Sequence, residues 1–104
     1  MDVLRSQRKS QEVPSWVTLI GDDIFIEEGA ELMPSIINTL DGPVYVGKGA
    51  HVMEGTMIRG SLALMDHSHL KMGSKIYGPT TIGPHSKVGG EVNNSVIFGY
   101  SNKA

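Results

Sequence analysis

The chain has 104 residues, which is enough for one domain with a small hydrophobic core. Its formal net charge of -2 at pH 7 predicts no nucleic-acid partner and no membrane-surface partner, because both require a basic surface. The lack of cysteine excludes disulfides, thiolate metal sites and a cysteine nucleophile, while 13 glycines predict many tight turns.

Residues 1–16 are expected to form a polar lead-in or linker. Residues 1–14 carry five charged side chains and no apolar run long enough for a signal peptide or a membrane span, so we expect a cytoplasmic location. Trp16, Val17 and Leu19 come just before the first repeat and are expected to cap an open end of the fold.

From residue 17 onward the main signal is a period of six residues. Aliphatic side chains recur at this spacing at Ile20, Ile26 and Leu32, and then at Val46, Val52, Ile58, Leu64, Leu70, Ile76, Ile82 and Val88. Four residues after most of these positions the side chain is small or β-branched, which suits a tight corner. A period of six fits neither a helix nor one long strand, so it predicts short strands joined by sharp corners.

Three six-residue units per turn predict a triangular solenoid in which residues eighteen apart lie above one another. The predicted fold class is therefore all-β, a parallel β-helix of about four coils over residues 17–104. Three aliphatic columns are expected inside it: Val46–Leu64–Ile82, Val52–Leu70–Val88 and Ile58–Ile76. Departures from the period predict a bulging loop at residues 38–43 and an irregular coil after Val88.

Several segments carry a family resemblance, namely IEEGAE, VGKGAH, VMEGTM, LKMGSK and IGPHSK. They resemble the hexapeptide repeats of the left-handed β-helix acyltransferases. Residues 78–104 are similar to the C-terminal region of the bifunctional N-acetylglucosamine-1-phosphate uridyltransferase and glucosamine-1-phosphate acetyltransferase family, in a sugar-nucleotidyltransferase-like branch. The resemblance covers roughly residues 17–104 and implies a left-handed coil, a homotrimer, a sugar-phosphate substrate and acetyl-CoA as acyl donor.

The resemblance also implies that this chain is a portion of the family's protein, truncated at both ends. No nucleotidyltransferase motif precedes the repeats, and the family's general-base histidine falls beyond Ala104. No catalytic residue is therefore expected within the chain, which should be inactive alone and is not expected to retain acetyl-CoA.

Four residues are the predicted substrate contacts: Lys75, Glu91, Asn93 and Asn94. The resemblance places Glu91 on a substrate-contacting glutamate, Asn93 where the acetyltransferases have lysine, and Lys75 where they have arginine. Lys75 keeps a positive charge for a phosphate, and Arg59 and Lys71 are further candidates for steering an anion. The alternative is that the asparagines form a tight corner and the cations are ordinary surface residues.

The four histidines form two pairs at a spacing of eighteen, His51 with His69 and His67 with His85, so each pair should stack vertically. Imidazole is a common zinc ligand, and trimeric β-helices related to γ-class carbonic anhydrases bind a metal with histidines from adjacent subunits. The alternative, which we expect, is a solvated histidine column or a subunit contact without metal.

Three functions remain open. The first is the β-helix portion of a sugar-nucleotide nucleotidyltransferase or acyltransferase. The second is a non-catalytic structural or oligomerisation module, and the third is a metal-dependent lyase similar to γ-class carbonic anhydrase.

Overall fold

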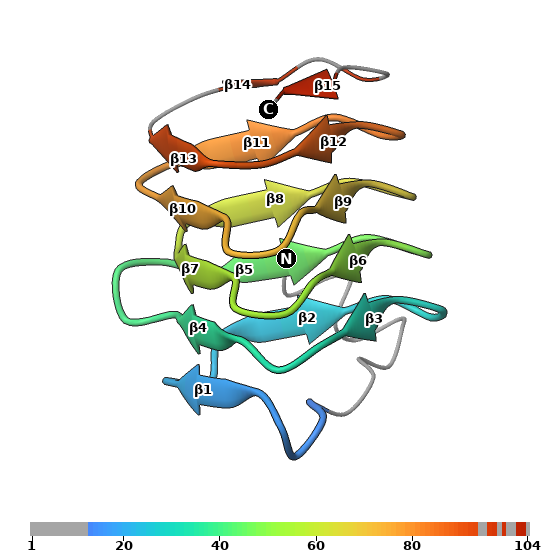
Figure 1. Cartoon of the computed structure of the whole chain (residues 1–104). Helices are drawn as coiled ribbons and strands as arrows, with labels where there is room; N and C mark the ends of the chain where they lie inside the picture. The colour runs from blue at the N-terminus through green and yellow to red at the C-terminus, as the bar shows by residue number, and fades with distance from the viewer. Residues whose placement is uncertain (1–12, 94–95, 98, 100–101, 104) are drawn as a thin grey trace.

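The computed structural model describes residues 13–93, 96–97, 99 and 102–103. Within these residues every regular element is a short β-strand, and the strands stack as the coils of one parallel β-helix (Figure 1). The predicted fold class is thus confirmed. In Figure 1 each coil runs from a strand at the left to a paler strand behind it, and then returns across the front. Because the chain climbs as it follows this path, the coil is left-handed.

The coil has three flat faces, and each face is a five-stranded parallel sheet. Sheet A contains β1 (Thr18–Ile20), β4 (Ile36–Asn38), β7 (Met57–Arg59), β10 (Lys75–Tyr77) and β13 (Glu91–Asn93). Sheet B contains β2 (Ile24–Ile26), β5 (Val44–Val46), β8 (Leu62–Leu64), β11 (Thr80–Ile82) and β14 (Val96–Ile97). Sheet C contains β3 (Glu31–Leu32), β6 (His51–Val52), β9 (His69–Leu70), β12 (Lys87–Val88) and β15 (Asn102–Lys103).

All three predicted aliphatic columns are present inside the coil. Strand register places Val46, Leu64 and Ile82 above one another, and likewise Val52, Leu70 and Val88, and Ile58 with Ile76. Each of these side chains is at most 2% exposed. The hydrophobic effect therefore acts on an unbroken stack of aliphatic side chains along each column.

The six-residue period predicts that Ile20 faces the interior, and this prediction is wrong. Its side chain is 38% exposed on the outer surface, and its neighbour Leu19 takes the inward position, opposite the fully buried Ile37. Because side chains alternate along a strand, only one of these two adjacent residues can face the interior. Val13 and Val17 also pack against the core at this end, whereas Trp16 is largely exposed.

The predicted loop is confirmed as the connection between β4 and β5, where residues 39–43 bulge out of the coil (Figure 1). Thr39 anchors its start, since its backbone N–H donates to the carbonyl of Ile20 at 2.8 Å. The irregular coil after Val88 is also present. Only residues 89 and 90 join β12 to β13, whereas four residues join β9 to β10.

The small residues at the corners point inward and their hydroxyl groups bond to backbone carbonyls. Ser68 Oγ donates to the carbonyl of Gly83 at 2.7 Å, and Thr56 Oγ1 donates to that of Met53 at 2.7 Å. Both side chains are fully buried. A larger side chain would not fit at these buried positions and could not make the hydrogen bond. The predicted role of these small residues in the corners is therefore confirmed.

Shortening a column residue should destabilise the whole coil. Leu64 is fully buried with a column neighbour on each side, so we expect Leu64→Ala to lower the free energy of unfolding by about 2–5 kcal/mol. The exposed Thr81→Ala serves as control and should change it by no more than about 0.5 kcal/mol. Urea denaturation followed by circular dichroism measures both. Equal stability of the two variants would contradict a stacked aliphatic interior.

Candidate functional site

The outer face of sheet A carries two parallel rows of side chains, because every second residue of each strand points outward. The strand register defines both rows. The first row is Thr18, Ile36, Met57, Lys75 and Glu91, and the second row is Ile20, Asn38, Arg59, Tyr77 and Asn93. The upper end of the face, over β10 and β13, is polar, and the lower end is largely apolar.

Three of the four predicted substrate contacts lie together on this face. Lys75 on β10 is the direct neighbour of Glu91 on β13, and Asn93 lies in the second row of the same strand. All three side chains are exposed. Asn94 lies outside the described residues. The short corner before β13 is what brings Glu91 opposite Lys75, because the two residues are sixteen rather than eighteen apart.

Tyr77 belongs to the same polar cluster and was not predicted. Its hydrogen bond to the Glu91 side chain, followed by partial desolvation and the carboxylate's charge, raises the pKa of the Tyr77 phenol above its usual value of 10.0. The phenol, which is protonated at neutral pH even at its ordinary pKa, donates to the carboxylate and so orients Glu91. The available signal was its position two residues after Lys75, which puts both side chains on one face of a strand.

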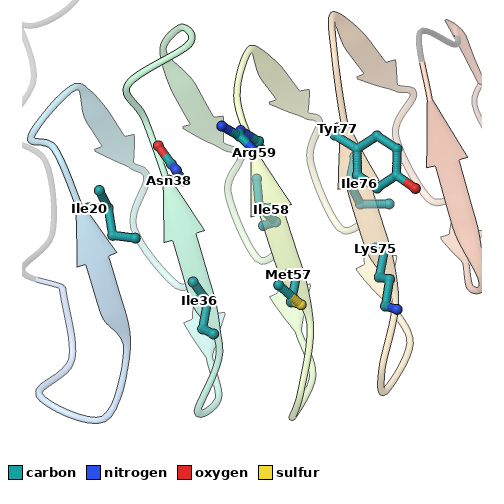
Figure 2. A pocket seen from close by; sticks show the side chains of 9 residues that line it. All are labelled: Ile20, Ile36, Asn38, Met57, Ile58, Arg59, Lys75, Ile76 and Tyr77. Carbon is teal, nitrogen blue, oxygen red and sulfur yellow. The ribbon is translucent and has the colours of Figure 1, made fainter.

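The two rows border a shallow cavity of about 310 Å³, which we call the trough (Figure 2). Its lining is Ile20, Ile36, Asn38, Met57, Ile58, Arg59, Lys75, Ile76 and Tyr77. Figure 2 shows these side chains distributed over β1, β4, β7 and β10. The trough therefore runs across the strands, along the axis of the coil.

Arg59 projects from β7 toward the loop of residues 39–43. Its Nε donates to Asp41 Oδ2 at 2.8 Å, so the loop supplies the anion that holds the guanidinium over the sheet. Of the other predicted anion-steering residues, Lys75 lines the trough as well. Lys71 does not, because it follows β9 on sheet C.

The four histidines stack in the two predicted vertical pairs. The rings of His51 and His69, on β6 and β9, have centroids 4.6 Å apart and are tilted by 13°. The rings of His67 and His85, in the corners between sheets B and C, are 5.1 Å apart. Both corner histidines have positive φ, 57° and 58°, and the His67 ring lies over Gly49, where a Cβ would collide with it.

The described residues contain no group of three or more His, Asp or Glu side chains arranged to hold a metal ion. Each histidine stack offers two imidazoles from one chain, so a zinc site there would need further ligands from a partner subunit. The metal hypothesis stays a prediction.

The His51–His69 stack places a histidine where protonation is unfavourable. Burial lowers the pKa of His69 below its ordinary 6.5, and positive charge on its neighbours lowers it further. These neighbours are His51 on β6, Lys87 on β12 and His67 in the preceding corner. The carboxylate of Glu31 on β3 lies against His51, with 3.5 Å between Oε2 and Nδ1.

Acidification should therefore destabilise the chain. Unfolded His69 has the ordinary pKa and binds its proton at higher pH than folded His69, so stability is complete above about pH 6.5 and decreases as the pH falls below it. We expect His69→Gln to reduce this dependence of the melting temperature on pH, measured by circular dichroism between about pH 7.5 and pH 5. Thr81→Gln, an exposed position on sheet B, should keep the original dependence. An unchanged slope in His69→Gln would show that His69 has no such role.

Comparisons with protein-family models, with curated proteins and with solved structures find no match for this chain. No helix that is long and apolar enough to cross a membrane occurs in the described part of the chain. The functional argument therefore starts from the side chains on sheet A.

Proposed function

We propose that this chain is the β-helix portion of a sugar-nucleotide nucleotidyltransferase or acyltransferase, and that the upper end of sheet A binds a phosphorylated amino sugar. The observation that carries this proposal is the pairing of Lys75 with Glu91 on adjacent strands, with Asn93 and Tyr77 beside them. The resemblance of the repeats to hexapeptide acyltransferases supports it independently.

Each member of the cluster has a role that suits such a ligand. The Lys75 ammonium attracts the phosphate as a point charge. The Glu91 carboxylate, oriented by Tyr77, accepts hydrogen bonds from the sugar's amine or hydroxyl groups, and the Asn93 amide donates and accepts with a further hydroxyl. One positive and one negative side chain, about one strand spacing apart, match a sugar that carries both a phosphate and an amine.

The reaction proposed for the intact protein is attack by the sugar's amine or hydroxyl on an acyl thioester such as acetyl-CoA. The thioester carbonyl becomes an oxyanion, which backbone amides stabilise, while a histidine base takes the proton of the attacking group. The oxyanion then re-forms the carbonyl as the C–S bond breaks, and the histidine returns the proton to the departing thiolate. Neither row of sheet A contributes an imidazole among its described residues. The role of this chain in the reaction is therefore to bind and orient the acceptor.

Binding of glucosamine-1-phosphate to the full chain tests the proposal. Lys75→Ala removes the ammonium from an exposed site and should weaken binding about five- to ten-fold, as measured by calorimetry or by chemical-shift titration. Lys87→Ala makes the same change on sheet C and should leave the affinity unchanged. Equal losses in the two variants, or shifts confined to sheets B and C, would contradict the proposed site.

A second candidate function, a structural module that self-associates, is favoured by the exposed apolar side chains at the lower end of sheet A. Ile20, Ile36 and Met57 are 38%, 39% and 46% exposed, and Trp16 beside them is 55% exposed. An apolar patch of this kind is typical of an interaction surface, and a homotrimer would bury one copy of it in each subunit.

Sedimentation tests the second candidate. If sheet A is the subunit interface, Ile36→Glu should convert an oligomer to monomers, because it places an unpaired charge in an apolar contact. Thr81→Glu on sheet B is the control and should keep the original mass. A monomer in the unmodified chain at high micromolar concentration would exclude this function.

A further inference from the structure

The trough is chemically asymmetric along its length. Its first row changes from Ile36 and Met57 to Lys75. The exposed Ile20, in the second row of β1 and diagonal to Ile36, adds an apolar side chain one strand further along. Since neighbouring strands lie about 4.8 Å apart, the distance from β10 to β1 is about 14 Å. The trough therefore offers an apolar track of that length that ends at a cation.

The polar side chains of the trough favour an anion at the same end. Two cations, Arg59 and Lys75, line it, and among the described residues no carboxylate does, although Glu91 is the strand neighbour of Lys75. Arg59 bonds to Asp41 through Nε, which uses one of the five donors of a guanidinium and leaves the others for a ligand. Tyr77 stands between Arg59 and Asn93 in the second row, so the head-group end continues into the polar cluster on β13.

The size of the trough suits a small molecule better than a protein. A volume of about 310 Å³ lies within the range of ligand pockets, which starts at roughly 300 Å³. A stable homodimer buries about 800 Å² of each partner, whereas four strands about 10 Å long at this spacing cover only about 190 Å² of the sheet. Two polar side chains of the second row, Asn38 and Arg59, also lie beside the apolar Ile36 and Met57 of the first row.

We propose that the trough binds an anionic amphiphile, with its phosphate or carboxylate against Lys75 and its alkyl chain lying over Met57 and Ile36 toward Ile20. This inference rests on the proposed function and deepens it, because it adds an alkyl chain to the phosphorylated substrate that Lys75 binds. The alkyl chain covers side chains that otherwise expose apolar surface to water.

Alkyl phosphates of graded length are the probes, used below their micelle-forming concentrations with the isotope-labelled full chain. Affinity should rise about two-fold per methylene from methyl phosphate to decyl phosphate, since an open trough removes roughly half of each methylene from water. Chemical-shift changes should map to β4, β7 and β10. Decyl maltoside, which has the chain and a neutral head, should bind at least ten-fold more weakly than decyl phosphate.

Two variants separate the chain contact from the head-group contact. Met57→Gln should reduce the dependence of affinity on alkyl-chain length and leave glucosamine-1-phosphate binding intact. Lys75→Ala should weaken the binding of decyl phosphate without affecting that of decyl maltoside. Met72→Gln makes the same change as Met57→Gln at an exposed corner outside the trough, and should behave as the unmodified chain.

The outcomes distinguish this inference from the proposed function. If glucosamine-1-phosphate binds at Lys75 but methyl and decyl phosphate bind equally, the inference is overturned and the proposed function stands. A dependence on chain length that survives Met57→Gln also overturns it. An oligomer that dissociates in Met57→Gln but not in Met72→Gln shows that a second copy covers the trough. This result overturns the inference, and glucosamine-1-phosphate binding then decides the proposed function.

Discussion

The stacking of inward aliphatic side chains is the constraint on which the rest of the structure depends. Each column residue packs on its equivalent in the coils above and below, as Leu64 does between Val46 and Ile82. A slip of one residue in any strand would turn its buried side chain to water, so the columns fix the register. The register in turn fixes which side chains meet on the outer faces. Lys75 and Glu91 are neighbours because Ile76 and Val92 are stacked behind them.

The period of six was enough to predict the columns from Val46 to Val88, because every corner in this stretch keeps the spacing of the column residues constant. The period did not predict the orientation of Ile20, because the adjacent Leu19 packs in the interior instead. The reason is a change of corner length: three residues join β1 to β2, whereas two join the equivalent strands β7 and β8. A periodic pattern indicates that corners exist. Where a corner gains or loses a residue, however, packing decides which of two adjacent aliphatic residues faces the interior.

The candidate site was predictable only in part, for the same reason. The family resemblance pointed to Lys75, Glu91 and Asn93. These residues meet only because the corner at Gly89 and Gly90 is two residues long, and the spacing of the sequence alone does not predict the register that results. Tyr77 carried no motif, and its bond to Glu91 crosses between strands diagonally. The pairing of the histidines was visible because that part of the coil is regular.

The loop of residues 39–43 shows how such a coil can acquire new chemistry. It leaves the sheet after Asn38, is tied to the previous coil by Thr39, and returns at Val44, which is fully buried. The coils on either side therefore stack as if the excursion were absent, while Asp41 at its tip reaches Arg59 on the next coil. Changes at the exposed Leu40 and Asp41 are therefore expected to affect folding little, whereas Gly42 packs against Ser61, where an added Cβ would come within 2.9 Å. A change at the exposed Asp41 would alter how Arg59 is held on sheet A and leave the buried columns in place. Ligand specificity on this face can thus change without a change in the hydrophobic core.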